Sequence, residues 1–519
     1  MNGHSTYVYL FLVVAILVLL IACANYVNLS TARSLRRAKE IGMRKVIGAK
    51  RQQLVTQLLG ESLLITLASF ILAVMIISFS IHSFNTFSGK SLTFDLISDT
   101  RLLWITMSTF LVVSLLAGCY PAFFLSSFSP IKVLRNKLAS SGQNAFIRQS
   151  LVVFQFTISI VLIISTLVIS RQMNFIQNRN LGLNKDQIIE LKLRLPVLHQ
   201  RDIIKNEILK ISGVTAATAN NFSYSKRLTN SPVRPEGAEK DDYSTENIIC
   251  ADHDFLKTFG IMLESGRDFS KNFYTDEIEA VIINESAVKH FNWGSPEQAI
   301  DKSIFLPMYG RTSKVIGVVK DFNCSSLHEN IKPIIIQISP DYQFLAVKIS
   351  AKTIPVAIDQ MKKVWNSLPL NSPFEYSFMD EDFAHLYHAE QQTQSIIAIL
   401  SGLAIFIACL GLFGLASFMT EQRMKEISIR KILGADVLGI TSLLTKDFIR
   451  LVLVSIVLSA PIAWFALTGW LESFAYKTNV PIWIFLAAGC CSVLIAIFTV
   501  SFQSIKAAIA NPIDSLRSE

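Results

Sequence analysis

One eleven-residue stretch, Lys39-Glu40-Ile41-Gly42-Met43-Arg44-Lys45-Val46-Ile47-Gly48-Ala49, occurs twice in this chain. The second copy reads Lys425-Glu426-Ile427-Ser428-Ile429-Arg430-Lys431-Ile432-Leu433-Gly434-Ala435. Both copies follow the frame K-E-I-x-x-R-K-x-x-G-A, and they lie 425 − 39 = 386 residues apart. A match at seven specified positions is improbable by chance, so the sequence indicates an internal duplication.

The duplication extends beyond the motif. Ile21-Ala22-Cys23 recurs as Ile407-Ala408-Cys409 at the same offset, and Pro130 recurs as Pro512 at 512 − 130 = 382. Each copy reads as an apolar helix, the charged motif, two more apolar helices and a proline-marked tail. The offset also pairs single residues: Asn25 with Gly411, Asn28 with Gly414, and Glu61 with Asp447.

The motif itself predicts a short basic amphipathic helix beside a membrane. Its acid precedes its arginine by four residues, the favourable order on a helix. Ile41, Val46 and Ile47 can share part of one apolar face, and Gly48 can provide a left-handed stop. Such a helix either rests on anionic headgroups or docks on a partner, and repetition of the specific pattern favours docking. The candidate docking residues are Lys39, Glu40, Ile41, Arg44, Lys45 and Gly48, with Lys425, Glu426, Ile427, Arg430, Lys431 and Gly434 in the second copy.

Composition excludes a soluble protein with one core. Of the 519 residues, 51% are hydrophobic, and the mean hydropathy is +0.43. The net charge of +9 comes from cations beside apolar runs, which is typical of cytoplasmic loops and points to membrane lipid, not to nucleic acid. The seven cysteines form no C-x-x-C and no Cys/His spacing suited to zinc. The sequence does not decide whether Cys250 and Cys324 form a disulfide.

Seven apolar runs are long enough to cross a bilayer. The cation-rich loops after the first and fifth runs predict a cytoplasmic side there, which places the N-terminus, a short loop around Lys477 and residues 171–393 outside. The runs are about 7–29, 58–81, 102–125, 151–170, 395–419, 448–471 and 482–505.

Residues 171–393 have the composition of a soluble α/β domain. Short β-branched runs predict strands at 280–284, 314–319 and 333–338, and helical patterns cover 285–290 and 355–365. The polar residues Asp252, His253, Asp254, Glu285 and His290 lack the spacing of a metal site and are interpreted as surface residues. The fold class is therefore an α-helical membrane protein of about seven transmembrane helices with one inserted extracytoplasmic α/β (α+β) domain.

With these residues in view, the chain resembles the permease subunit of the MacB/FtsX-type ABC transporters. The two motif helices, the first followed by 57–61, resemble the FtsX-type transmembrane domain, as does Tyr120-Pro121-Ala122 with Ser129-Pro130. The stretches 255–261, 264–269, 283–287 and 315–322 resemble the extracytoplasmic domain of the family.

The resemblance implies a domain organisation. Residues 1–149 are a first FtsX-type half with three helices and a cytoplasmic coupling helix near 33–53, and 150–170 are a fourth helix. Residues 171–393 are a MacB-like periplasmic core domain, and 394–519 are the second half with its coupling helix near 420–436. The first helix and first periplasmic domain of one repeat are missing from this pattern, so a truncated chain is expected.

The function implied is a permease that couples ATP hydrolysis by a separate ATPase dimer to motion of its periplasmic domain, for export of a substrate. An FtsX-like signalling or cell-envelope regulator and a lipoprotein-release permease remain alternatives. The chain has no G-x-x-x-x-G-K-[ST] loop, so it is not expected to be an enzyme or to hold a cofactor, and ATP is assigned to the partner. We expect a multi-pass protein of the bacterial inner membrane, with a periplasmic adaptor or envelope protein as a further partner.

Overall fold

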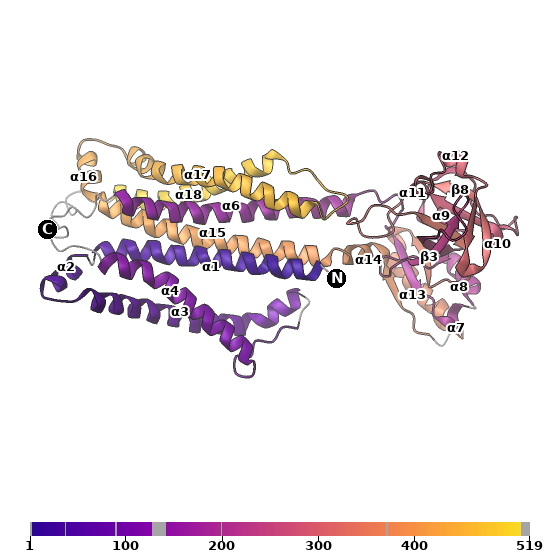
Figure 1. The fold of residues 1–519 in the computed structure, drawn as a ribbon, viewed down its shortest axis with the longest axis horizontal. Coiled ribbons are helices and arrows are strands. Elements are labelled where there is room, and N and C mark those ends of the chain that lie inside the picture. Colours follow the sequence, from indigo (N-terminus) through magenta and orange to yellow (C-terminus); the bar gives the residue numbers. More distant parts are fainter. Residues whose placement is uncertain are drawn as a thin grey trace. The chain divides into compact units, whose positions relative to one another are not determined.

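The computed structural model describes residues 3–36, 38–88, 91–126, 142–198, 200–369 and 372–509. The chain separates into two compact units. The helical unit consists of Met1–Arg171, Gln392–Gly469 and Asn479–Glu519, and the sheet unit consists of Gln172–Gln391 and Trp470–Thr478. Figure 1 shows the helices of the first unit and the strands of the second.

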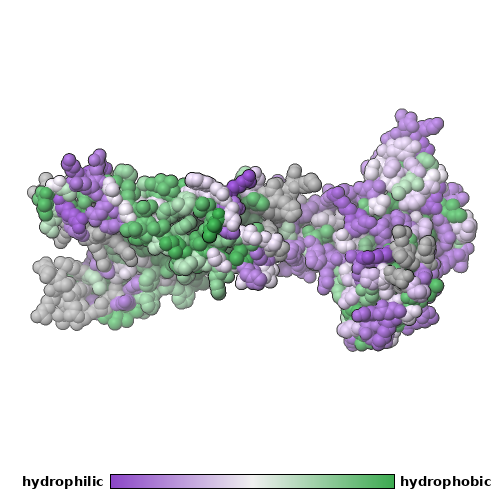
Figure 2. Space-filling view, turned by 90° about the horizontal axis from the view of Figure 1, so that it is seen from below, coloured by the Kyte–Doolittle hydropathy of each residue, from purple (hydrophilic) through white to green (hydrophobic). Residues whose placement is uncertain are grey.

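The seven predicted apolar helices are confirmed as helices, and each extends beyond its apolar run at one end or both. Each contains a stretch long and apolar enough to cross a membrane. Hydrophobic residues cover much of the helical surface in Figure 2, and Phe79 and Phe465 are 89% and 84% exposed. Apolar exposure on this scale is what a bilayer would cover. The helices are α1 (Gly3–Arg36), α3 (Arg51–Ser88), α4 (Thr100–Ser126), α6 (Gly142–Asn178), α15 (His388–Gln422), α17 (Val437–Leu471) and α18 (Ile482–Ile509).

The interior of the helical unit is built where these helices meet. One buried cluster joins α6, α15, α17 and α18 through residues such as Phe156, Leu412 and Phe448. A second cluster joins α1 to α6 and α15 and includes Ile21 and Ala404. Alanines in both clusters allow the helices to approach closely, as small residues do in membrane proteins; they are Ala404, Ala408, Ala416 and Ala496.

The described residues of the sheet unit form eleven strands in one mixed sheet, ordered β11-β1-β10-β2-β4-β3-β7-β8-β6-β9, with β5 beside β8. The three predicted strands are confirmed as β6, β9 and part of β8. The strands are β1 (Ile188–Lys192), β2 (Val214–Asn220), β3 (Thr229–Pro235), β4 (Ser244–Ala251), β5 (Leu263–Gly266), β6 (Ala280–Asn284), β7 (Ser303–Leu306), β8 (Arg311–Val319), β9 (Ile334–Ile338), β10 (Phe344–Ile349) and β11 (Tyr376–Phe378).

Short helices cover this sheet, and both helices predicted from the sequence are present as α11 and α13. Parallel pairing is limited to β4 with β9 and β6 with β8 among the described strands. The helices are α7 (Leu195–Leu198), α8 (Arg201–Leu209), α9 (Phe255–Phe259), α10 (Asp276–Glu279), α11 (Glu285–His290), α12 (Pro296–Ala299), α13 (Ile354–Ser367) and α14 (Met379–His385).

Two hydrophobic cores divide the sheet unit into two lobes. The first core lies among β1, β2, β10, α8 and α13 and contains Trp365. The second lies among β3, β4 and β6–β9 and contains Val281 and Ile335. Strands β2 and β4, where the lobes adjoin, are paired only through Asn220 and Ala251. Two backbone hydrogen bonds flank this pair: the Asn221 N–H donates to the Cys250 carbonyl at 3.0 Å, and the Asp252 N–H donates to the Ala219 carbonyl at 2.9 Å.

Candidate functional site

The repeated motif forms two short helices, α2 (Ala38–Val46) and α16 (Met424–Ile432). Both lie at the same end of the helical unit (Figure 1). The predicted ion pairs are present in both: Glu40 Oε1 lies 2.8 Å from Arg44 Nη2, and Glu426 Oε1 lies 2.7 Å from Arg430 Nη2. Because these side chains are about half exposed, the pairs add little stability. They chiefly hold each arginine against its own helix.

A glycine in the left-handed conformation ends each helix. Gly48 has φ +105° and its N–H donates to the Lys45 carbonyl at 3.1 Å, while the Ala49 N–H donates to the Arg44 carbonyl at 3.0 Å. This pair of bonds is the Schellman motif, which explains why the frame ends in G-A. The second copy repeats both bonds around Gly434, with φ +92°. The predicted left-handed stop is confirmed in both copies.

The prediction that Ile41, Val46 and Ile47 share one apolar face is wrong. Ile41 is 6% exposed, whereas Val46 and Ile47 are 66% and 82% exposed. Five residues advance a helix by one turn plus about 140°, so Ile41 and Val46 point to different sides. Ile41 anchors the helix to its own unit, and the other two residues face outward.

The second copy repeats this division. Ile427, the counterpart of Ile41, is 4% exposed and packs with Ile440 and Leu444 of α17. Ile432 and Leu433 are 63% and 81% exposed. We call the outward-facing apolar residues the tip residues: Met43, Val46 and Ile47 in the first copy, and Ile429, Ile432 and Leu433 in the second.

Polar contacts outside the motif orient both helices. Arg44 Nη1 donates to Gln57 Oε1 at 3.0 Å, and Gln57 Nε2 donates to Glu61 Oε1 at 3.2 Å. In the second copy, Arg423 Nη2 lies 3.1 Å from Asp447 Oδ2. Gln57 and Arg423 were not among the predicted site residues, although the correspondence of Glu61 with Asp447 pointed to this region.

The remaining predicted residues have separate surroundings. Burial, followed by the charge of Arg51, lowers the pKa of Lys45. Lys431 Nζ donates to the carbonyl of Ile509 at 3.4 Å. The side chains of Lys39 and Lys425 lie outside the described residues, as does the proline-marked tail of each copy.

A polar contact joins the first helix of each copy. Asn25 Nδ2 of α1 donates to the Ile407 carbonyl of α15 at 3.3 Å. A Cβ atom on Gly411 would lie 2.6 Å from Asn25 Oδ1, so only glycine allows this approach without a shift. A Cβ atom on Gly414 would meet the side chain of Leu29.

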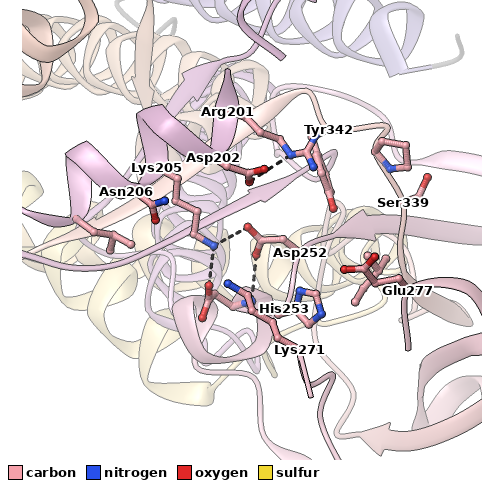
Figure 3. Close-up of a pocket in the computed structure, with 14 residues that line it drawn as sticks. Arg201, Asp202, Lys205, Asn206, Asp252, His253, Lys271, Glu277, Ser339 and Tyr342 are labelled. Atoms are coloured by element: carbon pink, nitrogen blue, oxygen red, sulfur yellow. Dashed lines mark hydrogen bonds and ion pairs between the residues drawn. The ribbon is translucent and has the colours of Figure 1, made fainter. Parts of the chain in front are cut away.

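A polar cleft of about 570 Å³ lies in the sheet unit between the two lobes (Figure 3). Lys205 of α8, only 8% exposed, reaches across to the β4–α9 turn. Its Nζ atom is 2.6 Å from Asp252 Oδ2 and 2.6 Å from Asp254 Oδ2. Burial raises the pKa of Asp254, but the hydrogen bond and charge of Lys205 lower it overall.

Asp252 connects the lobes beside the single strand pair. Its carboxylate accepts the Thr218 hydroxyl at 2.6 Å and the Ala219 N–H at 2.9 Å, both from β2. The sequence offers no local signal for this network, because Lys205 and Asp252 lie 47 positions apart. Only the fold brings them together.

The other acids and histidines noted in the sequence are dispersed. His290 Nε2 lies 3.1 Å from Glu246, and Glu285 accepts the Asp321 N–H at 3.0 Å. Among the described residues, no three His, Cys, Asp or Glu side chains are grouped to hold a metal. Cys250 and Cys324 are both free thiols, so they do not form a disulfide with each other.

Comparison with a family model reproduces the duplication. Residues 12–130 and 398–512 match the FtsX-like permease C-terminal family. The starts of the matches differ by 398 − 12 = 386 residues and their ends by 512 − 130 = 382, the two offsets found in the sequence.

The curated relatives include proteins named macrolide export ATP-binding/permease protein MacB. That of Campylobacter jejuni subsp. jejuni strain 81-176 is 28% identical over 121 residues, which are 23% of this chain. That of Bdellovibrio bacteriovorus is 26% identical over 123 residues, which are 24% of this chain. Each alignment spans 18% of the relative's own length.

Two solved structures resemble part of the chain. The periplasmic region of MacB from Actinobacillus actinomycetemcomitans is 16% identical, covering 40% of this chain and 97% of that one, with a TM-score of 0.30. The extracellular domain of the transporter YknZ from Gram-positive bacteria is 17% identical, covering 37% of this chain and 99% of that one, with a TM-score of 0.28.

Proposed function

Because the chain is an ABC permease of the MacB/FtsX type, we propose that it transmits the motion of a separate ATPase to its sheet unit in order to export a substrate. The observation that carries this proposal is the outward-facing apolar tip of α2, repeated at the same positions in α16. The relatives' names supply the export direction. The sheet unit is assigned to the periplasm, and the tips to the cytoplasmic side of the inner membrane.

The tips have the properties of a docking surface. Ile47 and Leu433 are the most exposed tip residues, at 82% and 81%. Exposed apolar side chains on a short charged helix gain free energy when a partner covers them. The arginines at the motif's centre would then form a polar rim around an apolar contact, the usual anatomy of a protein interface.

The geometry of the helices favours a protein partner over lipid headgroups. A headgroup contact requires only basic charge and an apolar side. Here each helix also has a buried isoleucine anchor, an ion-paired arginine and a Schellman stop. These features hold the tip residues in one conformation before binding, which reduces the entropy lost on docking.

Two copies of the tip suit a partner with two equivalent subunits. An ATPase dimer presents two related surfaces, and a permease with one tip would need a second copy to engage both. With both tips on one chain, a single polypeptide can engage the dimer.

The test replaces one tip residue in each copy with a charge, as Ile47→Asp with Leu433→Asp. Wild-type and variant chains are purified from host membranes, and the co-purifying ATPase is quantified. We expect the ATPase to be lost while the permease still inserts in the membrane, because a buried unpaired carboxylate opposes docking.

Leu438→Asp is the matched control. Leu438 is 78% exposed near the start of α17, but its counterpart at 438 − 386 = 52 is the polar Gln52, so it lies outside the repeated tip. Its ATPase yield should equal that of the wild type. Equal yields from the double tip variant would contradict docking. An intact ATPase complex that activates an envelope hydrolase but exports nothing would favour the regulator instead.

A further inference from the structure

The segment Trp470–Thr478 runs from the last two residues of α17 into the short loop that was predicted around Lys477, and it belongs to the sheet unit. We call it the clasp segment. Gln172, which is fully buried, holds its far end with three hydrogen bonds. Gln172 Nε2 donates to the Tyr476 carbonyl at 2.9 Å, and its Oε1 accepts the Thr478 N–H at 2.9 Å and the Thr478 hydroxyl at 3.1 Å.

Further contacts hold the middle of the clasp segment. The Arg179 guanidinium lies 4.0 Å from the centre of the Tyr476 ring, a cation–π distance. The Tyr476 N–H donates to the Leu327 carbonyl at 3.4 Å. Phe474 is 2% exposed and stacks on the His328 ring with centroids 4.0 Å apart and planes 25° apart.

His328 makes two hydrogen bonds that together require its charged form. Its Nδ1 is 3.0 Å from the Ser473 carbonyl oxygen of the clasp segment, and its Nε2 is 3.3 Å from Glu390 Oε1. A carbonyl and a carboxylate can only accept hydrogen bonds. Neutral imidazole carries one N–H and can satisfy one of them, whereas imidazolium satisfies both.

The groups around His328 favour that charge. Glu390 approaches from α15 and Glu329 is its chain neighbour, while Tyr387 brings a phenol whose oxygen accepts the Leu327 N–H at 2.6 Å. Arg179, the cation that helps to hold the clasp segment, lies over the Tyr476 ring. Burial lowers the His328 pKa, but the bonds to Glu390 and Ser473 and the charges of Glu390 and Glu329 raise it overall.

We propose that the clasp segment is a protonation-sensitive link: it is fastened while His328 is charged and loosens when His328 loses its proton. The chain passes between the two units at both ends of the clasp segment, as it does at both ends of Gln172–Gln391. A group whose pKa is raised in the folded state contributes stability below its ordinary pKa and loses it as pH rises through the raised value. One consequence rests on the proposed transport function: the fastened segment should transmit motion better than the loosened one.

The test measures amide hydrogen exchange of the clasp segment in the full chain, in lipid nanodiscs without ATPase, at about pH 5.5 and 8.5. Rates are corrected for the intrinsic effect of pH. We expect peptides containing Tyr476 and Thr478 to be several-fold better protected at the lower pH. In His328→Phe, which keeps an aromatic ring for stacking but has no N–H, protection should be lower at acidic pH and equal at both values.

Two further variants separate charge from structure. Gln172→Leu should lower protection at both pH values and keep the difference between them. His290→Phe removes the other histidine–glutamate pair described in the sheet unit and should leave the clasp segment unchanged.

Glu390→Gln keeps a hydrogen-bond acceptor without the negative charge, so the protection of the clasp segment should be lost at a lower pH than in the wild type. This variant tests the proposal even if His328→Phe does not fold. Wild-type protection independent of pH, or a pH effect that persists in folded His328→Phe, would overturn it. Neither result bears on ATPase docking, since no ATPase is present.

Discussion

Asn25 donates its side-chain amide to the carbonyl oxygen of Ile407 at 3.3 Å. Gln155 of α6 makes the matching bond to the Ile21 carbonyl at 3.2 Å, and 407 − 386 = 21, so equivalent carbonyls accept an amide in both copies. Asn25 also faces Gly411, its own counterpart at 411 − 386 = 25. Contact between equivalent residues is the property of a twofold interface. The duplicated helices α1 and α15 therefore cross near the pseudo-twofold axis.

Gly411→Ala should destabilise the helical unit. The added Cβ would lie 2.6 Å from Asn25 Oδ1, and forcing a methyl into a packed interface costs about 1–3 kcal/mol. The free energy of unfolding of the full chain in detergent measures this loss. Removing the opposing amide with Asn25→Ala in the same chain should recover part of it.

The control for this prediction is Gly402→Ala in the same helix. No other atom would approach its Cβ within 4 Å, so it should be neutral or stabilise the helix by up to about 1 kcal/mol. If Gly411→Ala and Gly402→Ala have the same free energy of unfolding, the close contact at Gly411 does not limit packing.

Gly48→Ala and Gly434→Ala should each loosen the end of a motif helix without a clash. Both glycines have positive φ, and no atom lies within 4 Å of an added Cβ, so the cost is backbone strain of about 1–2 kcal/mol. Amide exchange at Ala49 and Ala435 should accelerate. Gly60→Ala, in α3 and also free of neighbours, should leave those rates unchanged, and slow exchange in the motif variants would contradict the Schellman assignment.

The stability of the sheet unit should fall as pH rises from about 5 to 8. Glu190 is fully buried on β1 and accepts the Ser223 hydroxyl at 2.5 Å. Burial raises its pKa to about 8, with the Ser223 bond opposing the change and Asp382 adding to it. The folded state therefore binds a proton that the unfolded state releases, and the stability that this proton contributes is lost as pH rises.

Glu190→Gln should flatten that dependence, measured as the free energy of unfolding by denaturant at several pH values. His328 contributes with the same sign, so the comparison belongs in a His328→Phe background. A variant that keeps the full slope would show that another group is responsible.

Cysteine labelling with a membrane-impermeant reagent should place Lys50 and Lys477 on opposite sides of the membrane. Lys50 and Lys477 are both exposed, so accessibility alone should not separate Lys50→Cys from Lys477→Cys. In intact cells and a cysteine-free background, we expect only Lys477→Cys to react, while both react after permeabilisation. Labelling of Lys50→Cys in intact cells would reverse the proposed orientation.

Several features could be read from the sequence because they depend on neighbours along the chain. Periodic apolar residues marked the long helices. The Glu40–Arg44 pair follows from four-residue spacing on any helix, and the stop at Gly48 follows from the conformational freedom of glycine. The repeat offset identified Asn25 and Gly411 as equivalent positions, and the structure places them in contact.

Only the tertiary structure decided which side of each element is covered. Ile41 and Val46 are both apolar, and which of them is buried depends on what α2 packs against. The Lys205–Asp252 contact and the bonds from Gln172 to the clasp segment join residues 47 and about 300 positions apart. A residue's type states which hydrogen bonds it can make. Its partner is determined by the folded chain, since burial makes an unsatisfied polar group costly and so selects the arrangement in which such groups meet.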